Sequence, residues 1–211
     1  MNKQFAVILA FLFSLFFLNT AAAGESLSNS SPADELADHL RAISSLQGKF
    51  QQTLMADDGE LLQESSGDFA LSKKGQYRWE TKDPFAQLLI GDKNALLLYD
   101  PDLEQLNRRR LTESEKQTPL FILSSPDLSI AEAYLVSKSE DTFRLLPKSV
   151  SSSFVSMDIR FVAQVPVEIS VLDSLGQTTQ IRLLDIDVNQ TIDSTVFEFE
   201  APQGTDIIDE G

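Results

Sequence analysis

The chain contains no cysteine and only one histidine, His39, and these two scarcities remove most familiar enzyme chemistry. Without cysteine there is no disulfide, no thiolate nucleophile and no residue to which a lipid anchor could be attached. A lone histidine beside an apolar helical stripe is more typical of a surface or boundary position than of a catalytic base. No G-x-S-x-G elbow, P-loop or G-x-G-x-x-G motif occurs either. We therefore expect a protein that is not an enzyme, without catalytic residues, cofactors or a metal site.

Basic residues are also scarce, with 17 Lys and Arg against 32 Asp and Glu and a formal net charge of −15. Such a chain is a poor binder of nucleic acid and of anionic lipid headgroups. The basic run Arg108-Arg109-Arg110 does not change this expectation, because side chains alternate in direction along a strand and form no single patch. We interpret these three residues as edge or rim charges.

A hydrophobic run long enough for a good membrane anchor is missing too. The apolar run from Phe5 to Leu18 is interrupted only by Ser14, and it follows Lys3 and precedes Ala21-Ala22-Ala23. This pattern predicts a secretory signal peptide, residues 1–23, with an uncleaved anchor as the less favoured alternative. The remaining residues, 24–211, have the length of one domain in an exported protein.

What the chain does have is alternating apolar residues. A helix is expected first, because Ser31-Pro32-Ala33-Asp34 combines an N-cap, a proline at the first position and an acid three residues on. Gly48 is expected to end it. From Lys49 onward the period becomes two, with turns at Asp57-Asp58-Gly59, Lys74-Gly75 and Gly91–Asn94, which predicts a series of antiparallel strands.

Two short helices are expected to interrupt the strands, because Thr118-Pro119 and Ser125-Pro126 each resemble an N-cap followed by proline. Strands then resume up to Phe197-Glu198-Phe199, with a bulge where the apolar phase slips between Leu183 and Leu184. The fold class expected is mainly β: an unclosed antiparallel barrel of about ten to eleven strands, covered by short helices. Its apolar concave face either packs a core or lines a cavity for an apolar ligand.

Two acidic clusters, Asp57-Asp58-Gly59-Glu60 and Asp100-Pro101-Asp102-Leu103-Glu104, could in principle bind Ca²⁺. Neither has the spacing of an EF-hand loop, and both fall where the strand pattern predicts turns. Aspartate is favoured in turns because it hydrogen-bonds the nearby backbone, so turns are the preferred interpretation.

The order of several short motifs resembles the periplasmic carriers of outer-membrane lipoproteins, the LolA family, over nearly the whole of residues 24–211. The motifs that carry the resemblance are Phe50-x-Gln52, Gly67-Asp68-Phe69, Tyr77-Arg78-Trp79 followed by Pro84, Tyr99 to Gln105, Thr118-Pro119-Leu120, Asp173 to Thr178 and Phe197 to Asp206. The resemblance implies a half-barrel with a helical lid. It further implies a monomeric periplasmic carrier that takes triacylated lipoproteins from an inner-membrane ABC transporter, LolCDE, and delivers them to an outer-membrane receptor lipoprotein, LolB.

Strand and helix phase, combined with this resemblance, gives an expected acyl-chain cavity. The sheet side is expected to consist of Phe50, Leu54, Phe69, Leu71, Tyr77, Trp79, Leu88, Ile90 and Tyr99, and the lid side of Leu36, Leu40, Leu120, Phe121 and Leu123.

The family commonly has an Arg-Pro pair whose arginine bonds to backbone carbonyls of the lid and holds it shut. Lys73-Lys74 stands at the matching positions here. Lys73 keeps the charge but loses the planar fork of donors, so it is a candidate lid latch of altered chemistry. Replacing Lys73 by leucine is expected to impair capture of cargo or its release.

Other functions remain open at this stage. A related carrier of another lipid or hydrophobic ligand is the first alternative, and a secreted esterase is a remote one. The receptor itself, which shares the fold, needs a lipid-modified cysteine, and a two-domain stress regulator would need a longer chain.

Overall fold

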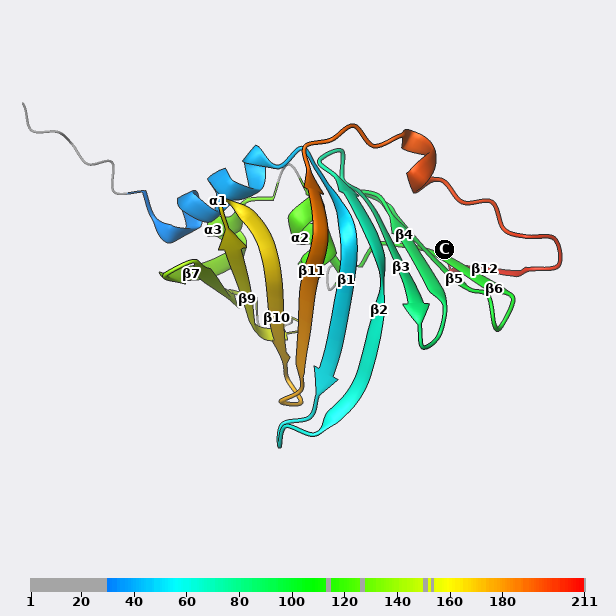
Figure 1. The fold of residues 1–211 in the computed structure, drawn as a ribbon, viewed down its shortest axis with the longest axis horizontal. Helices are drawn as coiled ribbons and strands as arrows, with labels where there is room; N and C mark the ends of the chain where they lie inside the picture. The colour runs from blue at the N-terminus through cyan, green and yellow to red at the C-terminus, as the bar shows by residue number, and fades with distance from the viewer. Residues whose placement is uncertain (1–29, 113–114, 126–127, 150–151, 153, 211) are drawn as a thin grey trace, which may run out of the picture.

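In the computed structural model, which describes residues 30–112, 115–125, 128–149, 152 and 154–210, twelve strands form one sheet (Figure 1). The expected signal peptide, residues 1–23, lies outside the described residues. The strands are β1 (Ser45–Met55), β2 (Leu61–Ser72), β3 (Gln76–Asp83), β4 (Gln87–Gly91), β5 (Ala95–Asp100), β6 (Gln105–Arg110), β7 (Tyr134–Ser139), β8 (Thr142–Pro147), β9 (Phe154–Val162), β10 (Val165–Asp173), β11 (Thr178–Val188) and β12 (Asp206–Glu210). The helices are α1 (Pro32–Ala42), α2 (Pro119–Ser124) and α3 (Ile130–Ala133), with 3₁₀ turns η1 (Glu115–Gln117) and η2 (Ser194–Phe197).

The sheet is unclosed, as predicted. Its strand order is β12-β6-β5-β4-β3-β2-β1-β11-β10-β9-β8-β7, so β12 and β7 are its two edges. Every neighbouring pair is antiparallel except β12 and β6, which run parallel. The parallel edge strand is one reason why the strand count exceeds the ten to eleven expected.

The first helix begins as its sequence predicts and ends earlier. Ser31 caps α1 in a capping box with Asp34, but the helix stops at Ala42, and Gly48 lies inside β1. Between Gln47 and Lys49 the register against β11 shifts, and a Cβ atom on Gly48 would lie 2.6 Å from the carbonyl oxygen of Leu184. Gly48 is therefore needed for close strand packing at this bulge, which confirms the irregularity expected near Leu184.

Two other expectations at element ends were wrong. The second short helix is only α3, whose N-cap position is Ser129 rather than Ser125, and β7 begins directly after it at Tyr134. Pro126 lies outside the described residues. Phe197-Glu198-Phe199 forms no strand: Phe197 ends η2, whose cap is Asp193, and the following residues are irregular. A single turn of helix is favoured there because the Asp193 side chain accepts from the Thr195 amide.

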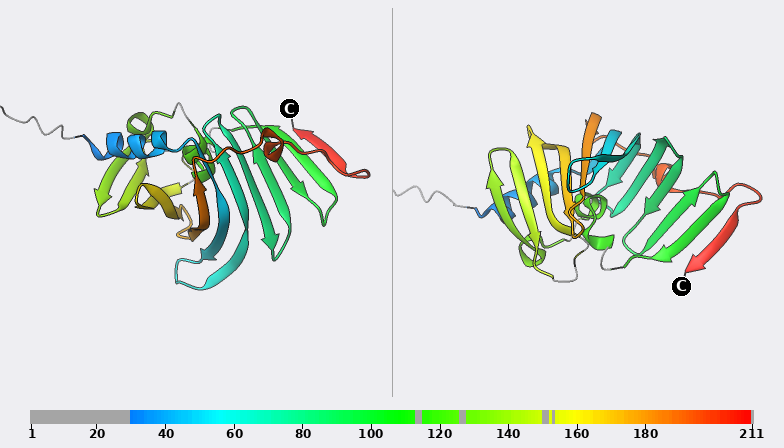
Figure 2. Two further views of the ribbon diagram at one scale, coloured as in Figure 1. Left: turned by 45° about the horizontal axis from the view of Figure 1, so that its top comes forward. Right: turned by 90° about the horizontal axis from the view of Figure 1, so that it is seen from below.

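The three helices lie on the concave face of the curved sheet. In Figure 1, α2 lies behind β11 and β1, and the view from below in Figure 2 shows it inside the curve of the strands. α1 packs against β7 and α3, while α2 packs against β2 and β3. The core lies between these helices and the sheet, and its buried members include Leu36, Leu40, Leu46, Phe143, Leu145, Met157 and Ile159.

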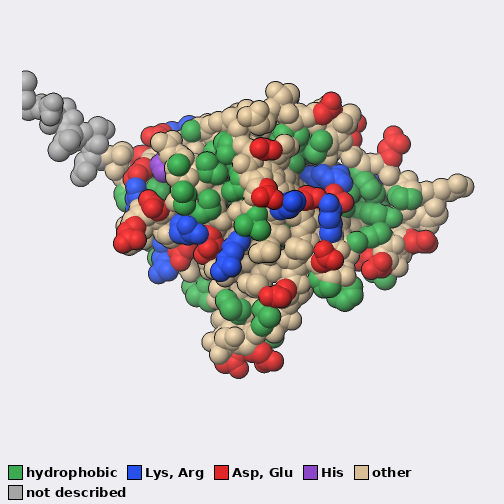
Figure 3. Space-filling view, in the orientation of Figure 1, with side chains coloured by type: hydrophobic (Ala, Val, Ile, Leu, Met, Phe, Trp, Pro, Cys, Tyr) green, Lys and Arg blue, Asp and Glu red, His purple; other side chains and the backbone are tan. Residues whose placement is uncertain are grey.

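The convex face carries charge of both signs. Residues directly opposite one another in the register point to the same face, so Arg144, Asp158, Arg160, Glu168 and Arg182 share this outer face. Figure 3 shows acidic and basic side chains intermingled over it. Among the described residues, no helix has the length and apolarity needed to cross a bilayer.

The two acidic clusters are turns, as preferred from the sequence. The Asp58 carboxylate accepts from the Glu60 amide, and the Asp100 carboxylate accepts from the amides of Asp102 and Leu103. Each aspartate thus satisfies the backbone of its own turn.

Candidate functional site

An aromatic floor lies on the concave face, where β1, β2 and β3 run side by side. The rings of Phe50 and Trp79 stack with centroids 3.8 Å apart, and Phe69 lies 5.9 Å from Trp79. Phe50 and Phe69 are buried, whereas Trp79 is half-buried. The three side chains come together because Phe69 is directly opposite Trp79 in the register and Phe50 is opposite Gly67.

Two glycines make room for these rings. A Cβ atom on Gly67 would lie 1.8 Å from the Glu80 carbonyl oxygen and 2.9 Å from the Phe50 ring. A Cβ atom on Gly91 would lie 2.1 Å from the ring of Tyr77, which is opposite it in the register. Side chains at either position would push an aromatic ring or a strand out of place.

The helix α2 covers part of this floor. Its N-cap Thr118 accepts from the Phe121 amide, and Pro119 takes the first helical position, as the sequence predicted. A cavity of about 310 Å³ lies beneath it, lined by Gln52, Trp79, Leu89, Thr118, Pro119, Leu120, Val171, Thr179 and Ile181. Its lining is mainly apolar, which suits a hydrocarbon ligand.

A second cavity on the same face, of about 270 Å³, continues from the first toward the β3–β4 turn. Both include Gln52, Trp79 and Leu89 in their lining, and the second adds Gln63, Ser65, Thr81, Pro84, Phe85, Gln87 and Leu98. The concave face therefore offers one continuous region whose character changes from apolar to polar.

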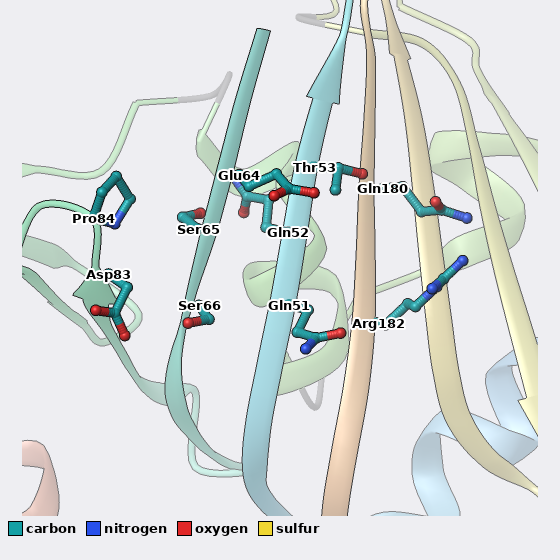
Figure 4. A pocket seen from close by; sticks show the side chains of 10 residues that line it. All are labelled: Gln51, Gln52, Thr53, Glu64, Ser65, Ser66, Asp83, Pro84, Gln180 and Arg182. Atoms are coloured by element: carbon teal, nitrogen blue, oxygen red, sulfur yellow. The ribbon is translucent and has the colours of Figure 1, made fainter. Parts of the chain in front are cut away.

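A larger cavity of about 550 Å³ reaches the convex face, and all its lining residues except Pro84 have polar or charged side chains (Figure 4). Its lining includes Gln51, Thr53, Glu64, Gln180 and Arg182. Such a lining does not suit acyl chains, because a hydrocarbon there would displace water from polar groups without replacing their hydrogen bonds.

Next to it, Glu168 accepts hydrogen bonds from Gln180 and Arg160. Burial alone raises the pKa of Glu168, but these bonds outweigh it and hold that pKa below its ordinary value.

Lys73 reaches the C-terminal end of α2. Its Nζ donates to the carbonyl oxygen of Ser125, the C-cap residue, at 3.3 Å. Burial of the ammonium group, with repulsion from Arg41, lowers the pKa of Lys73 below its ordinary value. The residue expected at the latch position thus contacts a backbone carbonyl of the helix that covers the cavity.

The structure brings together only part of the expected cavity. Trp79 and Leu120 line it; Phe50, Phe69, Leu71 and Tyr77 form the floor on the same face; and Leu54 lies half-buried on that face, opposite Thr179. Leu36, Leu40 and Leu123 are buried in the main core, and Phe121 is half-buried. None of these last four is among the residues that line the cavity beneath α2.

Leu88, Ile90 and Tyr99 were expected on the concave face, and the register places them on the other one. Leu89 is opposite Trp79, so its neighbours on either side, Leu88 and Ile90, point away, as does Tyr99 opposite Leu88. The C-terminal segment covers them: Phe199 lies 4.8 Å from Tyr99, and Phe197 shares a small cavity with Ile90. β4 is apolar on both faces because both are covered.

Sequence reasoning missed Leu89, Val171 and Ile181. The run Leu88-Leu89-Ile90 shows no alternation that could select a face. The inward direction of Tyr77 and Trp79 was the signal that could have identified Leu89. Pairing β3 with β4 across their turn places Gly91 opposite Tyr77 and Leu89 opposite Trp79, on the same face.

Comparison with known proteins identifies the family of this chain. Residues 41–200 match the family model described as outer membrane lipoprotein carrier protein LolA. The chain belongs to the LolA family. It is 37% identical over 183 residues to the outer-membrane lipoprotein carrier protein of Chromohalobacter salexigens, covering 85% of this chain and 87% of that protein. It is 32% identical over 205 residues to the protein of that name from Hahella chejuensis, covering 94% and 98%.

Among solved structures, an uncharacterized conserved protein of Thermus thermophilus matches with a TM-score of 0.54 at 11% identity, covering 85% of this chain and all of that one. This likeness concerns the fold alone.

Proposed function

We propose that this protein is a periplasmic carrier that shields the acyl chains of lipoproteins during their passage to the outer membrane. Family membership supports this proposal, and the observation that carries it is the apolar cavity between Trp79 and the lid residue Leu120. Each methylene group withdrawn from water contributes about 0.8 kcal/mol, so free acyl chains would not cross the periplasm unshielded.

A lid that moves is part of the proposal. Three long acyl chains need more room than the 310 Å³ found beneath α2, so α2 has to swing away for loading. The contact of Lys73 with the Ser125 carbonyl is the natural candidate for the latch that holds the lid in this arrangement. An ammonium group donates one bond where the family's arginine offers a fork, so the latch is expected to open more readily.

The route is proposed on the same basis. The protein would receive triacylated lipoproteins from the LolCDE transporter in the inner membrane and pass them to the LolB receptor in the outer membrane. The net charge of −15 fits a carrier that remains soluble beside anionic membranes.

A release assay tests the carrier function. Residues 24–211 are added to spheroplasts that synthesise a labelled triacylated lipoprotein, and the supernatant is examined for a soluble one-to-one complex. An established carrier of the family serves as the positive control. No complex, with the added protein folded and the control active, would contradict the proposal; mass spectrometry of co-purifying lipids would then test for another hydrophobic ligand.

A further inference from the structure

The inward side chains of four adjacent strands change character at one level of the sheet. Along β1, Phe50 is followed by Gln52; along β3, Trp79 is followed by Thr81; and along β4, Leu89 is preceded by Gln87. On β2, Ser65 and Gln63 lie beyond Gly67 and Phe69 toward the β1–β2 turn. These five residues, Gln52, Gln63, Ser65, Thr81 and Gln87, are here named the polar belt, and they line one cavity.

The polar belt is uncharged, although the protein is not. The outward side chains of the same strands include Lys49, Glu64, Asp68, Arg78 and Glu80, and Lys82, which forms an ion pair with Asp68. The inward positions paired across β1 to β4 carry no charged residue. A solvated surface of this chain would be expected to carry charge, so the neutrality of these inward positions on β1 to β4 calls for a different environment, with the nearest charge at Asp100 on β5.

The hydrogen-bonding capacity of the polar belt is nearly unused. Among the described residues, no partner donates to or accepts from the side chains of Gln52, Gln63, Ser65 and Thr81. Gln87 donates one amide N–H to the Asp100 carboxylate at 3.3 Å, which fixes the orientation of its amide group. A second N–H and the amide oxygen of Gln87 stay available.

We propose that the polar belt binds the carbonyl groups that join acyl chains to their head group, namely the ester and amide carbonyls of a triacylated cargo. This inference rests on the proposed carrier function. Carbonyl oxygens are acceptors only, and amide and hydroxyl groups supply donors without the desolvation cost of a charged side chain.

The position of the polar belt fits this role. Gln52, Trp79 and Leu89 line both the apolar cavity beneath α2 and the cavity of the belt. A hydrocarbon chain that enters the first cavity therefore places its linkage at the second. A carbonyl group that loses water near the apolar floor needs a hydrogen-bond donor. The polar belt provides donors where the two cavities meet.

The test compares three probes: a synthetic tripalmitoylated lipopeptide, dipalmitoylglycerol, and diphenylhexatriene, a hydrocarbon with no carbonyl group. Gln52→Leu and Gln87→Leu are titrated with each. Gln51→Leu, which changes the neighbouring residue on the other face of β1, is the matched control. Urea unfolding of each variant verifies that its fold is retained.

Each belt variant is expected to bind the lipopeptide and dipalmitoylglycerol about fivefold more weakly, from the loss of one hydrogen bond, while its affinity for diphenylhexatriene is unchanged or higher. Equal losses for all three probes, or no loss for any, would overturn the inference. A loss restricted to the lipopeptide would assign the belt to peptide carbonyls and overturn it too.

Failure of the carrier function itself gives a separate result. If the unmodified protein binds dipalmitoylglycerol but not the lipopeptide, lipoprotein carriage is contradicted, and the belt is judged on the contrast between dipalmitoylglycerol and diphenylhexatriene alone.

Discussion

The indole of Trp79 stacks on the ring of Phe50 at an interplanar angle of 23°, and the two residues come from strands that are not neighbours in the sheet. β2 lies between them, and Gly67 is the residue of β2 that faces Phe50. The stack exists because Gly67 has no side chain to separate the rings. It joins the core to the cavity, since Phe50 is buried and Trp79 lines the space beneath α2.

Replacing Gly67 by alanine is expected to destabilise the protein strongly. The new methyl group would meet the Glu80 carbonyl oxygen, a backbone atom that cannot move without disturbing β3. We expect a loss of about 3 kcal/mol or more in the free energy of unfolding, measured by urea titration. Gly59→Ala is the control, because a Cβ atom there has nothing within 4 Å and only its φ of 87° is strained. Equal losses in both variants would contradict this explanation.

Leu88 and Leu89 are expected to have different roles although they are adjacent. Leu88→Ala, on the convex side and 6% exposed, should lower the free energy of unfolding by about 2–4 kcal/mol and leave ligand affinity unchanged. Leu89→Ala should lower affinity for a hydrophobic probe several-fold with a smaller loss of stability. Trp79, the single tryptophan of the chain, reports both processes through its fluorescence. Reduced probe affinity in Leu88→Ala would argue against the assignment of faces.

Lys73→Leu is expected to loosen the lid. Loss of the hydrogen bond to Ser125 should speed dissociation of a bound hydrophobic probe about fivefold, measured by stopped-flow fluorescence. Lys73→Arg should keep the slow rate, because arginine restores a donor to the same carbonyl. The control is Lys74→Leu, which changes an exposed neighbouring lysine. If Lys73→Leu and Lys74→Leu release the probe at the same rate, Lys73 is not the latch.

Tyr134 is expected to make the stability of the protein fall at alkaline pH. Burial raises the pKa of its hydroxyl to about 12, above the ordinary value of 10.0. In the unfolded chain the hydroxyl ionises near pH 10, while the folded protein keeps its proton, so stability falls as the pH rises from 10 toward 12. The loss reaches about 2–3 kcal/mol, and Tyr134→Phe should abolish this part of the pH dependence in urea titrations. If the free energy of unfolding of Tyr134→Phe falls with pH as steeply as that of the unmodified protein, this explanation is wrong.

The sequence predicted those parts of the structure that depend on local chemistry. Ser31 and Thr118 cap helices because their side chains accept backbone hydrogen bonds within one turn. The alternation of Tyr77 and Trp79 selected the correct face because Arg78, between them, is charged. The role of Lys73 as a lid latch came from the family resemblance and stays a prediction; in the structure its Nζ donates to the Ser125 carbonyl oxygen.

Only the tertiary structure decided those features for which the local sequence pattern favours no single arrangement. Leu88, Leu89 and Ile90 are equally apolar, and their faces follow from pairing with β3 and from the C-terminal segment that covers the convex side. The last strand, β12, forms because β6 leaves an open edge, and nothing in Asp206 to Glu210 indicates a parallel partner one hundred residues earlier. The polar belt likewise appears only when four strands are placed in register, because its members are scattered along the chain and share a face through long-range pairing.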